Sequence, residues 1–158
     1  MKDVKTLERQ LTGLPLYQYE ILPTKELTFS EKVRLICQNE CERYGNSWSC
    51  PPASGTVEEC RKVCMQYPNC LVLVTAQDQE DHEALTTQAE KLVKEEGWQT
   101  LTLSAESCAV CEQCAYPGQP CRFPDRMRPC VEGFGILVTK LLQRLDVDVP
   151  AWCSLVLF

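Results

Sequence analysis

The sequence predicts a single α+β domain over residues 1–158, in which a small mixed β-sheet with packed helices carries a cysteine-rich metal-binding lobe. Hydrophobic residues make up 44% of the chain and charged residues 24%, which is typical of a globular protein with one core. Segments with the period of a helix alternate with segments with the period of a strand. Twelve cysteines accompany a single histidine, and seven of the cysteines lie in two segments, 37–50 and 108–121.

The first two elements are a helix and a strand. Residues 3–12 carry apolar side chains at helical spacing, so they predict an amphipathic helix that ends near Gly13. Residues 16–22 alternate between apolar and polar side chains, which predicts a half-buried strand that Pro23 stops.

A second helix leads into the first cysteine segment. Thr28 and Glu31 match the capping-box pattern, which predicts a helix beginning after Thr28. If this helix continues for one more turn, Cys37 and Cys41 lie four residues apart on the same side.

Strands and helices then alternate along the chain. Thr56 and Glu59 form another capping-box pattern and predict the start of a helix. A strand over 71–75, a helix over 79–96 and a strand over 98–103 follow with short connections. This order suggests a βαβ unit, whose pairing direction the sequence leaves open.

The last two elements are a helix and a strand. Apolar side chains from Phe134 to Leu145 recur at helical spacing and predict a helix. The apolar run 152–158 predicts a closing strand.

The first cysteine segment combines a C-x3-C spacing with a stiff loop, 43–52. Pro51 and Pro52 remove two backbone donors and restrict the preceding cysteine to an extended conformation. A stiff loop suits a ligand that must be held in place, so this segment favours ligation over the burial of free thiols. The candidate ligands are Cys37, Cys41 and Cys50.

The second segment places Cys108, Cys111 and Cys114 at three-residue intervals, with Cys121 seven residues later. A C-x2-C-x2-C run lets successive thiolates reach neighbouring irons of one iron–sulfur cluster. Structural zinc more commonly takes two separated C-x2-C pairs. The run therefore favours an iron–sulfur cluster and leaves zinc as the alternative.

The two segments together supply seven thiolates, one fewer than two fully ligated four-iron clusters need. Two clusters would leave one iron open, unless Cys130 supplies the eighth thiolate. There are two alternatives: a single cluster that leaves the three cysteines of segment 37–50 unused, or a zinc ion bound by those three cysteines. The remaining cysteines share helical faces or strands with apolar residues, so they are predicted to pack in the core. These are Cys60, Cys64, Cys70 and Cys153.

Charge and compartment narrow the function classes. The N-terminal residues lack the apolar run of a secretory signal, and no segment is long enough to span a membrane, so we expect a cytoplasmic protein. Clustered thiols in a reducing compartment serve metals more often than disulfides. The net charge of −6 argues against nucleic-acid binding and would suit a basic protein partner. A redox protein is one candidate partner, and the sequence leaves the choice open.

Other candidate residues are weaker. His82 lies in an acidic helical stretch, where it is expected to be solvated rather than a ligand. Arg122, Arg126 and Arg128 follow the second cysteine segment, where they could attract an anion, balance a negatively charged cluster or remain solvated. The chain has no phosphate-binding glycine loop, no G-x-S-x-G motif and no histidine-based zinc-enzyme motif.

Two motifs are specific in combination. The first is Arg34-Leu-Ile-Cys37, then Cys41, then Tyr44-Gly-x-x-Trp-Ser-Cys50-Pro-Pro; the second is Cys108-x2-Cys111-x2-Cys114, Pro120-Cys121-Arg122-x-Pro124, Arg128-Pro129 and Glu132-Gly-Phe-Gly-Ile-x-Val138. In these motifs the chain resembles a family of small prokaryotic proteins described as predicted metal-binding proteins of unknown function.

The resemblance implies a metal or iron–sulfur site and no established reaction. The chain departs from the family pattern at Cys130, where serine is more usual, and in its additional core cysteines, which leaves the ligand count open toward more metal. The site implied by the resemblance is built from Cys37, Cys41, Cys50, Cys108, Cys111, Cys114 and Cys121.

The function predicted from the sequence is metal binding, with one or two 4Fe–4S clusters that serve electron transfer or an accessory redox role. Two alternatives remain. One is a zinc-stabilised structural or interaction module. The other is an enzyme in which a cluster held by three cysteines uses its open iron to bind a substrate.

Overall fold

The centre of the fold is a four-stranded sheet in the order β1-β2-β4-β3, seen in a computed structural model that describes residues 2–76 and 78–158. Its strands are β1 (Gln18–Pro23), β2 (Asn69–Thr75), β3 (Leu101–Leu103) and β4 (Trp152–Leu157). All three neighbouring pairs are antiparallel. The α+β class is confirmed, whereas the sheet is antiparallel rather than mixed.

The predicted strand–helix–strand unit is present in a different form. β2 and β3 both run antiparallel to β4, so they are parallel to each other, and α4 (Gln79–Glu95) connects them. The last strand of the chain lies between them in the sheet. The register pairs Val72 with Leu155 in β2 and β4, and Leu103 with Leu155 in β3 and β4.

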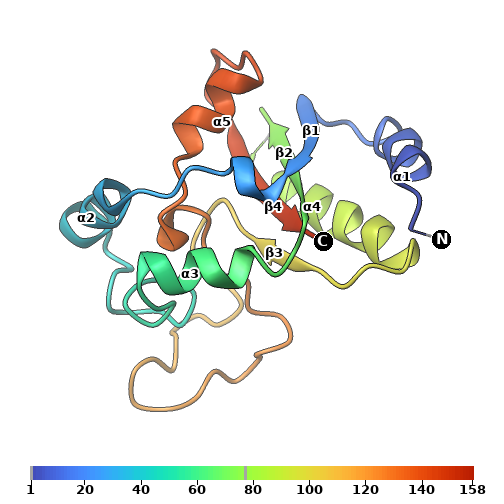
Figure 1. Ribbon diagram of the computed structural model, residues 1–158. Coiled ribbons are helices and arrows are strands. Elements are labelled where there is room, and N and C mark those ends of the chain that lie inside the picture. The colour runs from blue at the N-terminus through green and yellow to red at the C-terminus, as the bar shows by residue number, and fades with distance from the viewer. Residues whose placement is uncertain (1, 77) are drawn as a thin grey trace.

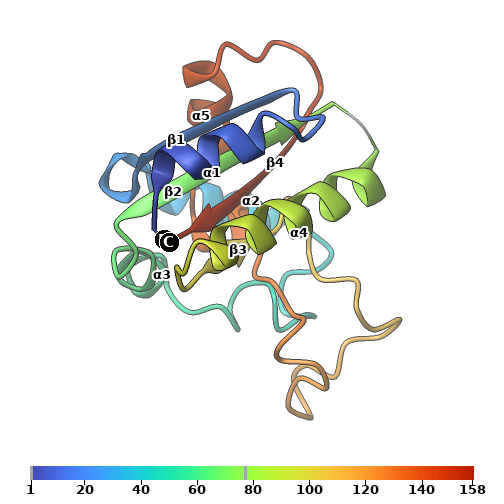
Figure 2. The same ribbon diagram turned by 90° about the vertical axis from the view of Figure 1, so that its right-hand side faces the viewer.

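Helices cover both faces of this sheet (Figures 1 and 2). Successive side chains of a strand point to opposite faces, so each buried strand supplies both layers of the core. On one face, α1 (Val4–Leu11) and α4 pack against residues such as Leu71, Leu73 and Val156. The other face is covered by α3 (Val57–Cys64) and by α5 (Val138–Arg144). Across the described residues, no helix combines the length and the apolar character that a membrane span requires.

The helix starts follow their caps. The Thr56 side chain accepts a hydrogen bond from the Glu59 backbone N–H and completes the predicted capping box of α3. The capping box predicted at Thr28 is wrong, since α2 (Glu31–Glu40) is capped by Ser30, whose hydroxyl accepts from the Lys32 N–H. A 3-10 turn, η1 (Thr24–Glu26), precedes it.

The predicted helix from Phe134 to Leu145 is interrupted. A 3-10 helix, η2 (Glu132–Phe134), ends at Gly135, which has a φ of 80°. The Gly135 carbonyl accepts a hydrogen bond of 2.8 Å from the Ser30 N–H, and Ile136 bridges Phe29. These long-range bonds turn the chain away from helical geometry, so α5 begins only at Val138.

The four cysteines predicted to pack in the core are buried there. Cys60 and Cys64 face inward from α3, while Cys70 and Cys153 lie in β2 and β4, and all four belong to one hydrophobic cluster. Burial, together with the charge of Cys60, raises the pKa of the Cys64 thiol to about 12, which keeps this thiol neutral.

The prediction that His82 is solvated is wrong. His82 belongs to α4, and its side chain is fully buried on the inner side of this helix. Its Nδ1 lies 2.9 Å from the Thr75 hydroxyl. The acidic residues around it occupy the outer face of the helix, while the helical period directs this one position inward. Burial lowers the pKa of His82 to about 4.

We expect His82 to make the protein less stable in acid. Its pKa is about 6.5 in an unfolded chain, so protonation favours unfolding as the pH falls from about 6.5 through the folded value near 4. The difference between the two pKa values corresponds to about 3 kcal/mol. Urea denaturation from pH 7 to pH 4 should show wild type losing about this much relative to His82→Asn. Metal loss in acid affects both proteins and cancels in the comparison, so a difference that does not change with pH would contradict the prediction.

Gly135→Ala should destabilise the fold. A side chain at a φ of 80° is strained, and the new Cβ would lie 2.9 Å from both methyl carbons of Val57. We expect a loss of about 3 kcal/mol in the free energy of unfolding, measured with urea. Gly118→Ala is the matched control, because nothing lies within 4 Å of a Cβ placed there. Equal urea midpoints for the two variants would show that Gly135 is not constrained.

Candidate metal centre

Eight of the twelve cysteines line two neighbouring cavities. Both cavities are lined by residues of the loop after α2 and of the long loop that follows β3, and Figure 1 shows these two loops at the same end of the molecule. We call the cysteines around one cavity the first cysteine set: Cys37, Cys41, Cys50 and Cys130. Those around the other are the second cysteine set: Cys108, Cys111, Cys114 and Cys121.

Three separate parts of the chain build the first cysteine set. α2 supplies Cys37 from its last turn, and Cys41 caps the helix, with its N–H donating to the Cys37 carbonyl. The Cys130 N–H donates to the Ser49 carbonyl at 3.1 Å, which fixes this cysteine beside Cys50. The set therefore depends on a contact between segments eighty residues apart in the sequence.

The thiols of the first cysteine set influence one another. Burial raises the pKa of Cys37, and the charges of Glu132, Cys41 and Cys50 raise it further. Burial also raises the pKa of Cys130, to about 12, with Cys50 and Glu132 adding to the effect. Thiolates gathered in this way repel one another, so a bound metal cation would stabilise their charged forms.

The walls of the first cavity are held by backbone and arginine contacts. The Arg34 guanidinium donates to the carbonyls of Gly55 at 2.7 Å and Gly133 at 2.8 Å, which ties α2 to the loops on both sides. Gly133 packs closely, because a Cβ added there would lie 3.2 Å from Pro51. The cavity encloses about 280 Å³.

The second cysteine set lies within one loop that is tied to its neighbour. The Trp48 indole N–H donates to the Gln119 carbonyl at 3.0 Å, and its ring meets Tyr116 edge to face at 4.8 Å. Inside the loop, the Arg122 guanidinium donates to the Gln113 carbonyl at 2.9 Å. These contacts wrap the loop around its own cysteines.

Among the thiols of the two sets whose pKa is shifted, Cys114 is the one with a lowered pKa. Burial raises its pKa, but the backbone N–H groups of Tyr116 and Trp48, the Ser47 hydroxyl and the charge of Arg43 together bring the pKa below its usual value. Donors of this kind stabilise a thiolate and also tune the potential of a cluster that the thiolate binds.

Ser49 and Arg43 join the two sets. The buried Ser49 hydroxyl accepts the Cys108 N–H at 2.9 Å and lies 3.4 Å from the Cys50 sulfur, so it contacts one cysteine of each set. Arg43 lines both cavities and donates to the Cys108 carbonyl at 3.1 Å. Its positive charge also opposes the rise in the pKa of Cys50. The sets thus share one cation and one hydroxyl.

The two cavities differ in the space they offer to a metal group. The first, at about 280 Å³, has room for a group of several atoms, whereas the second, at about 20 Å³, has room for a single water-sized particle. Among the described residues, no three side chains of cysteine, histidine, aspartate or glutamate are arranged to bind one metal ion as they stand. The thiolates of a four-iron cluster bind separate irons, so they need not converge on one point.

The structure places all seven cysteines that were predicted as ligands around the two cavities, together with Cys130. The three cysteines of segment 37–50 share a cavity, the four of segment 108–121 share another, and Cys130, which the sequence left open, lies in the first. Sequence reasoning missed Arg43 and Ser49 as the link between the sets. Ser49 lies directly before Cys50 in the stiff loop, but its partner is 59 residues away, and no local pattern signals that.

Ser49→Ala should disturb both cysteine sets at once. The change leaves the partly buried Cys108 N–H without its acceptor, which costs up to about 1–3 kcal/mol. We expect a fall of that size in the free energy of unfolding and a lower metal content per chain, measured on the purified protein. Ser54→Ala is the matched control, because the Ser54 hydroxyl makes only a 3.5 Å bond to the Gly133 carbonyl. If both variants bind metal like wild type, Ser49 does not link the sets.

Comparison with known proteins agrees with this geometry. A family model described as a predicted metal-binding protein matches residues 20–154, a range that includes both cysteine sets. No curated protein and no solved structure matches the chain. The match covers most of the sequence, and the chain belongs to this family of predicted metal-binding proteins.

Proposed function

We propose that this protein is an iron–sulfur protein in which each cysteine set holds a 4Fe–4S cluster and the two clusters pass electrons. The observation that carries the proposal is the division of eight cysteines into four and four around adjacent cavities. Four thiolates are the ligand set that a 4Fe–4S cluster takes. Since Cys130 supplies the first set with a fourth thiol, the proposal needs no open iron.

The chemistry of the ligands supports clusters. The only histidine is buried on the inner side of α4 and lies in neither cavity, so no imidazole competes with the thiols of either set as a ligand. The first cavity is large enough for a multi-atom group. A bound cluster would accept and release single electrons, while the chain would supply burial, the Cys114 donors and the Arg43 charge, which are the factors that set a potential.

Electron transfer is supported by how the sets are arranged. Both cavities include Arg43, so two clusters would be separated by little more than one side chain. The net charge of −6 suits a redox partner with a basic surface. A reducing cytoplasm, which we infer as the location, would keep the thiols reduced and leave the eight of the two sets available for metal.

A zinc ion in the second cysteine set is the second candidate. The observation that favours it is the small volume of that cavity, about 20 Å³, because a four-iron cluster there would require the thiols to turn outward. Zinc takes four thiolates in structural sites and would close the loop around itself. In this case one redox cluster would lie beside a structural ion.

Metal analysis of anaerobically purified protein separates these candidates. Two clusters predict about eight irons and eight sulfides per chain in a brown protein. About four irons with one zinc would assign the smaller cavity to zinc. A colourless protein that holds only zinc after anaerobic reconstitution with iron and sulfide would overturn the electron-transfer proposal.

Single alanine variants should remove the clusters one at a time. Cys130→Ala and Cys114→Ala each delete one thiol from a different set, so each should lose about half of the bound iron and sulfide. Cys153→Ala is the control, because this thiol is buried in the core and lies in neither set. Full iron content in Cys130→Ala would remove Cys130 from the ligands, and iron loss in the control would show a general effect of cysteine removal.

A further inference from the structure

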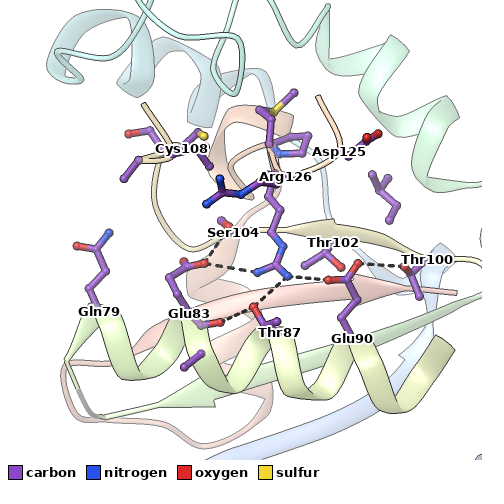
Figure 3. Close-up of a pocket in the computed structure, with 18 of the residues that line it drawn as sticks. Gln79, Glu83, Thr87, Glu90, Thr100, Thr102, Ser104, Cys108, Asp125 and Arg126 are labelled. Atoms are coloured by element: carbon purple, nitrogen blue, oxygen red, sulfur yellow. Dashed lines mark hydrogen bonds and ion pairs between the residues drawn. The ribbon is translucent and has the colours of Figure 1, made fainter. Parts of the chain in front are cut away.

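A third and larger cavity lies beside the second cysteine set. It encloses about 730 Å³ between α4, β3 and the loop 104–130, and we call it the α4 cavity. Figure 3 shows Glu83 and Glu90 on the helix, Thr102 on the strand, and Cys108 with Arg126 on the loop across from them. Its volume falls within the range of about 300–1,000 Å³ that is usual for small-molecule sites.

The floor of the α4 cavity is internally neutralised. The Arg128 guanidinium lies 2.6 Å from a Glu90 carboxylate oxygen and 3.7 Å from one of Glu83. The Lys94 ammonium lies 2.8 Å from Glu90 as well. Two carboxylates and two cations therefore balance, so this part of the cavity has little net attraction for a charged ligand.

The rim of the α4 cavity keeps two charges of opposite sign without partners. Asp125 and Arg126 both line the cavity and are exposed, and neither forms an ion pair with another of the described residues. The Arg126 guanidinium rests 5.5 Å from the centre of the Phe123 ring. An unpaired arginine binds a carboxylate well, and an unpaired aspartate next to it accepts hydrogen bonds from an ammonium group.

A buried hydroxyl also lacks a partner. Thr102 lines the cavity from β3 and is only 6% exposed, yet its hydroxyl has no hydrogen-bond partner among the described residues. A buried polar group without a partner costs about 1–3 kcal/mol. A ligand in the cavity that offers a donor or an acceptor would remove that cost.

We propose that the α4 cavity binds a small zwitterion of the α-amino acid class, with its carboxylate on Arg126, its ammonium group on Asp125 and its side chain toward Thr102. In an α-amino acid the ammonium and carboxylate groups are bonded to the same carbon atom. This close spacing of opposite charges matches a cation and an anion on successive residues of one loop. The cavity is lined by three carboxylates and three cations, so it offers no net electrostatic attraction to a dicarboxylate or to a simple cation. A zwitterion needs none, because each of its two charged groups can pair with one of the two rim charges that lack an ion-pair partner among the described residues.

The α4 cavity and the cavity of the second cysteine set share a wall. Cys108, Val110 and Met127 line both cavities, so an occupant of one lies against the wall of the other. The binding proposed here does not rest on the proposed function, because it uses residues outside both cysteine sets. Calorimetry on the purified protein measures it whatever metal the protein holds.

The test is a calorimetric titration of the full chain with each of the twenty proteinogenic L-amino acids at millimolar concentration. For the tightest binder, the methyl ester and the N-acetyl derivative remove one charge each. We expect each derivative to bind about tenfold or more weakly, since a hydrogen bond to a charged group is worth about 1.5–3 kcal/mol. Absence of binding by all twenty amino acids would overturn the proposal, as would binding of both derivatives as tightly as the parent amino acid.

Three variants locate the site. Arg126→Gln and Asp125→Asn remove the rim charges from exposed side chains without ion pairs, so folding should be unaffected and affinity should fall about tenfold or more. Thr102→Val keeps the shape and removes the hydroxyl, so it should weaken binding while leaving the urea midpoint unchanged or higher. Arg61→Gln, on α3 and outside the cavity, is the matched control. If both rim variants bind the amino acid with wild-type affinity, the binding site lies outside this rim.

Discussion

The hydrogen bonds of Ser49 hold together two loops that otherwise belong to different parts of the fold. Its carbonyl accepts the Cys130 N–H, and its hydroxyl accepts the Cys108 N–H, so one residue fixes cysteines of both sets. The neighbouring Ser47 hydroxyl lies 2.8 Å away and is buried with it. Buried hydrogen bonds between backbone and hydroxyl groups are costly to break, so this small polar core can define the spacing of the eight thiols.

The rest of the centre follows from that junction. Once the loops are joined, Arg43 has its guanidinium between the sets, where it donates to the Cys108 carbonyl, while its Nε stays buried without a partner in the described part of the chain. A half-buried arginine is stabilised by nearby negative charge or strong acceptors. The charge of Arg43 acts to lower the pKa of one thiol in each set, Cys50 and Cys114, so it favours their thiolate forms. The cation and the thiols therefore stabilise each other.

The sequence predicted what depends on local spacing and missed what depends on distant contacts. The capping box at Thr56 and the inward positions of Cys60 and Cys64 follow from short-range patterns, and the structure confirms them. The cap of α2 is Ser30 rather than the predicted Thr28, because the Thr28 carbonyl accepts a hydrogen bond from the distant Leu137 N–H. Likewise the grouping within each cysteine segment was predictable, but the place of Cys130 depends on the strand-like bridge that it forms with Ser104, which only the folded chain brings into contact.

The position of β4 affects how the protein is made. This strand separates β2 from β3, and it is the last of the four to leave the ribosome. During translation the sheet therefore cannot form as a unit, since β3 has no strand to pair with until Trp152–Leu157 has emerged. The loop that carries the second cysteine set starts one residue beyond β3, so its attachment to the core waits for the same event. Both ends of the cysteine loop are therefore anchored to the complete sheet only after these residues have been synthesised.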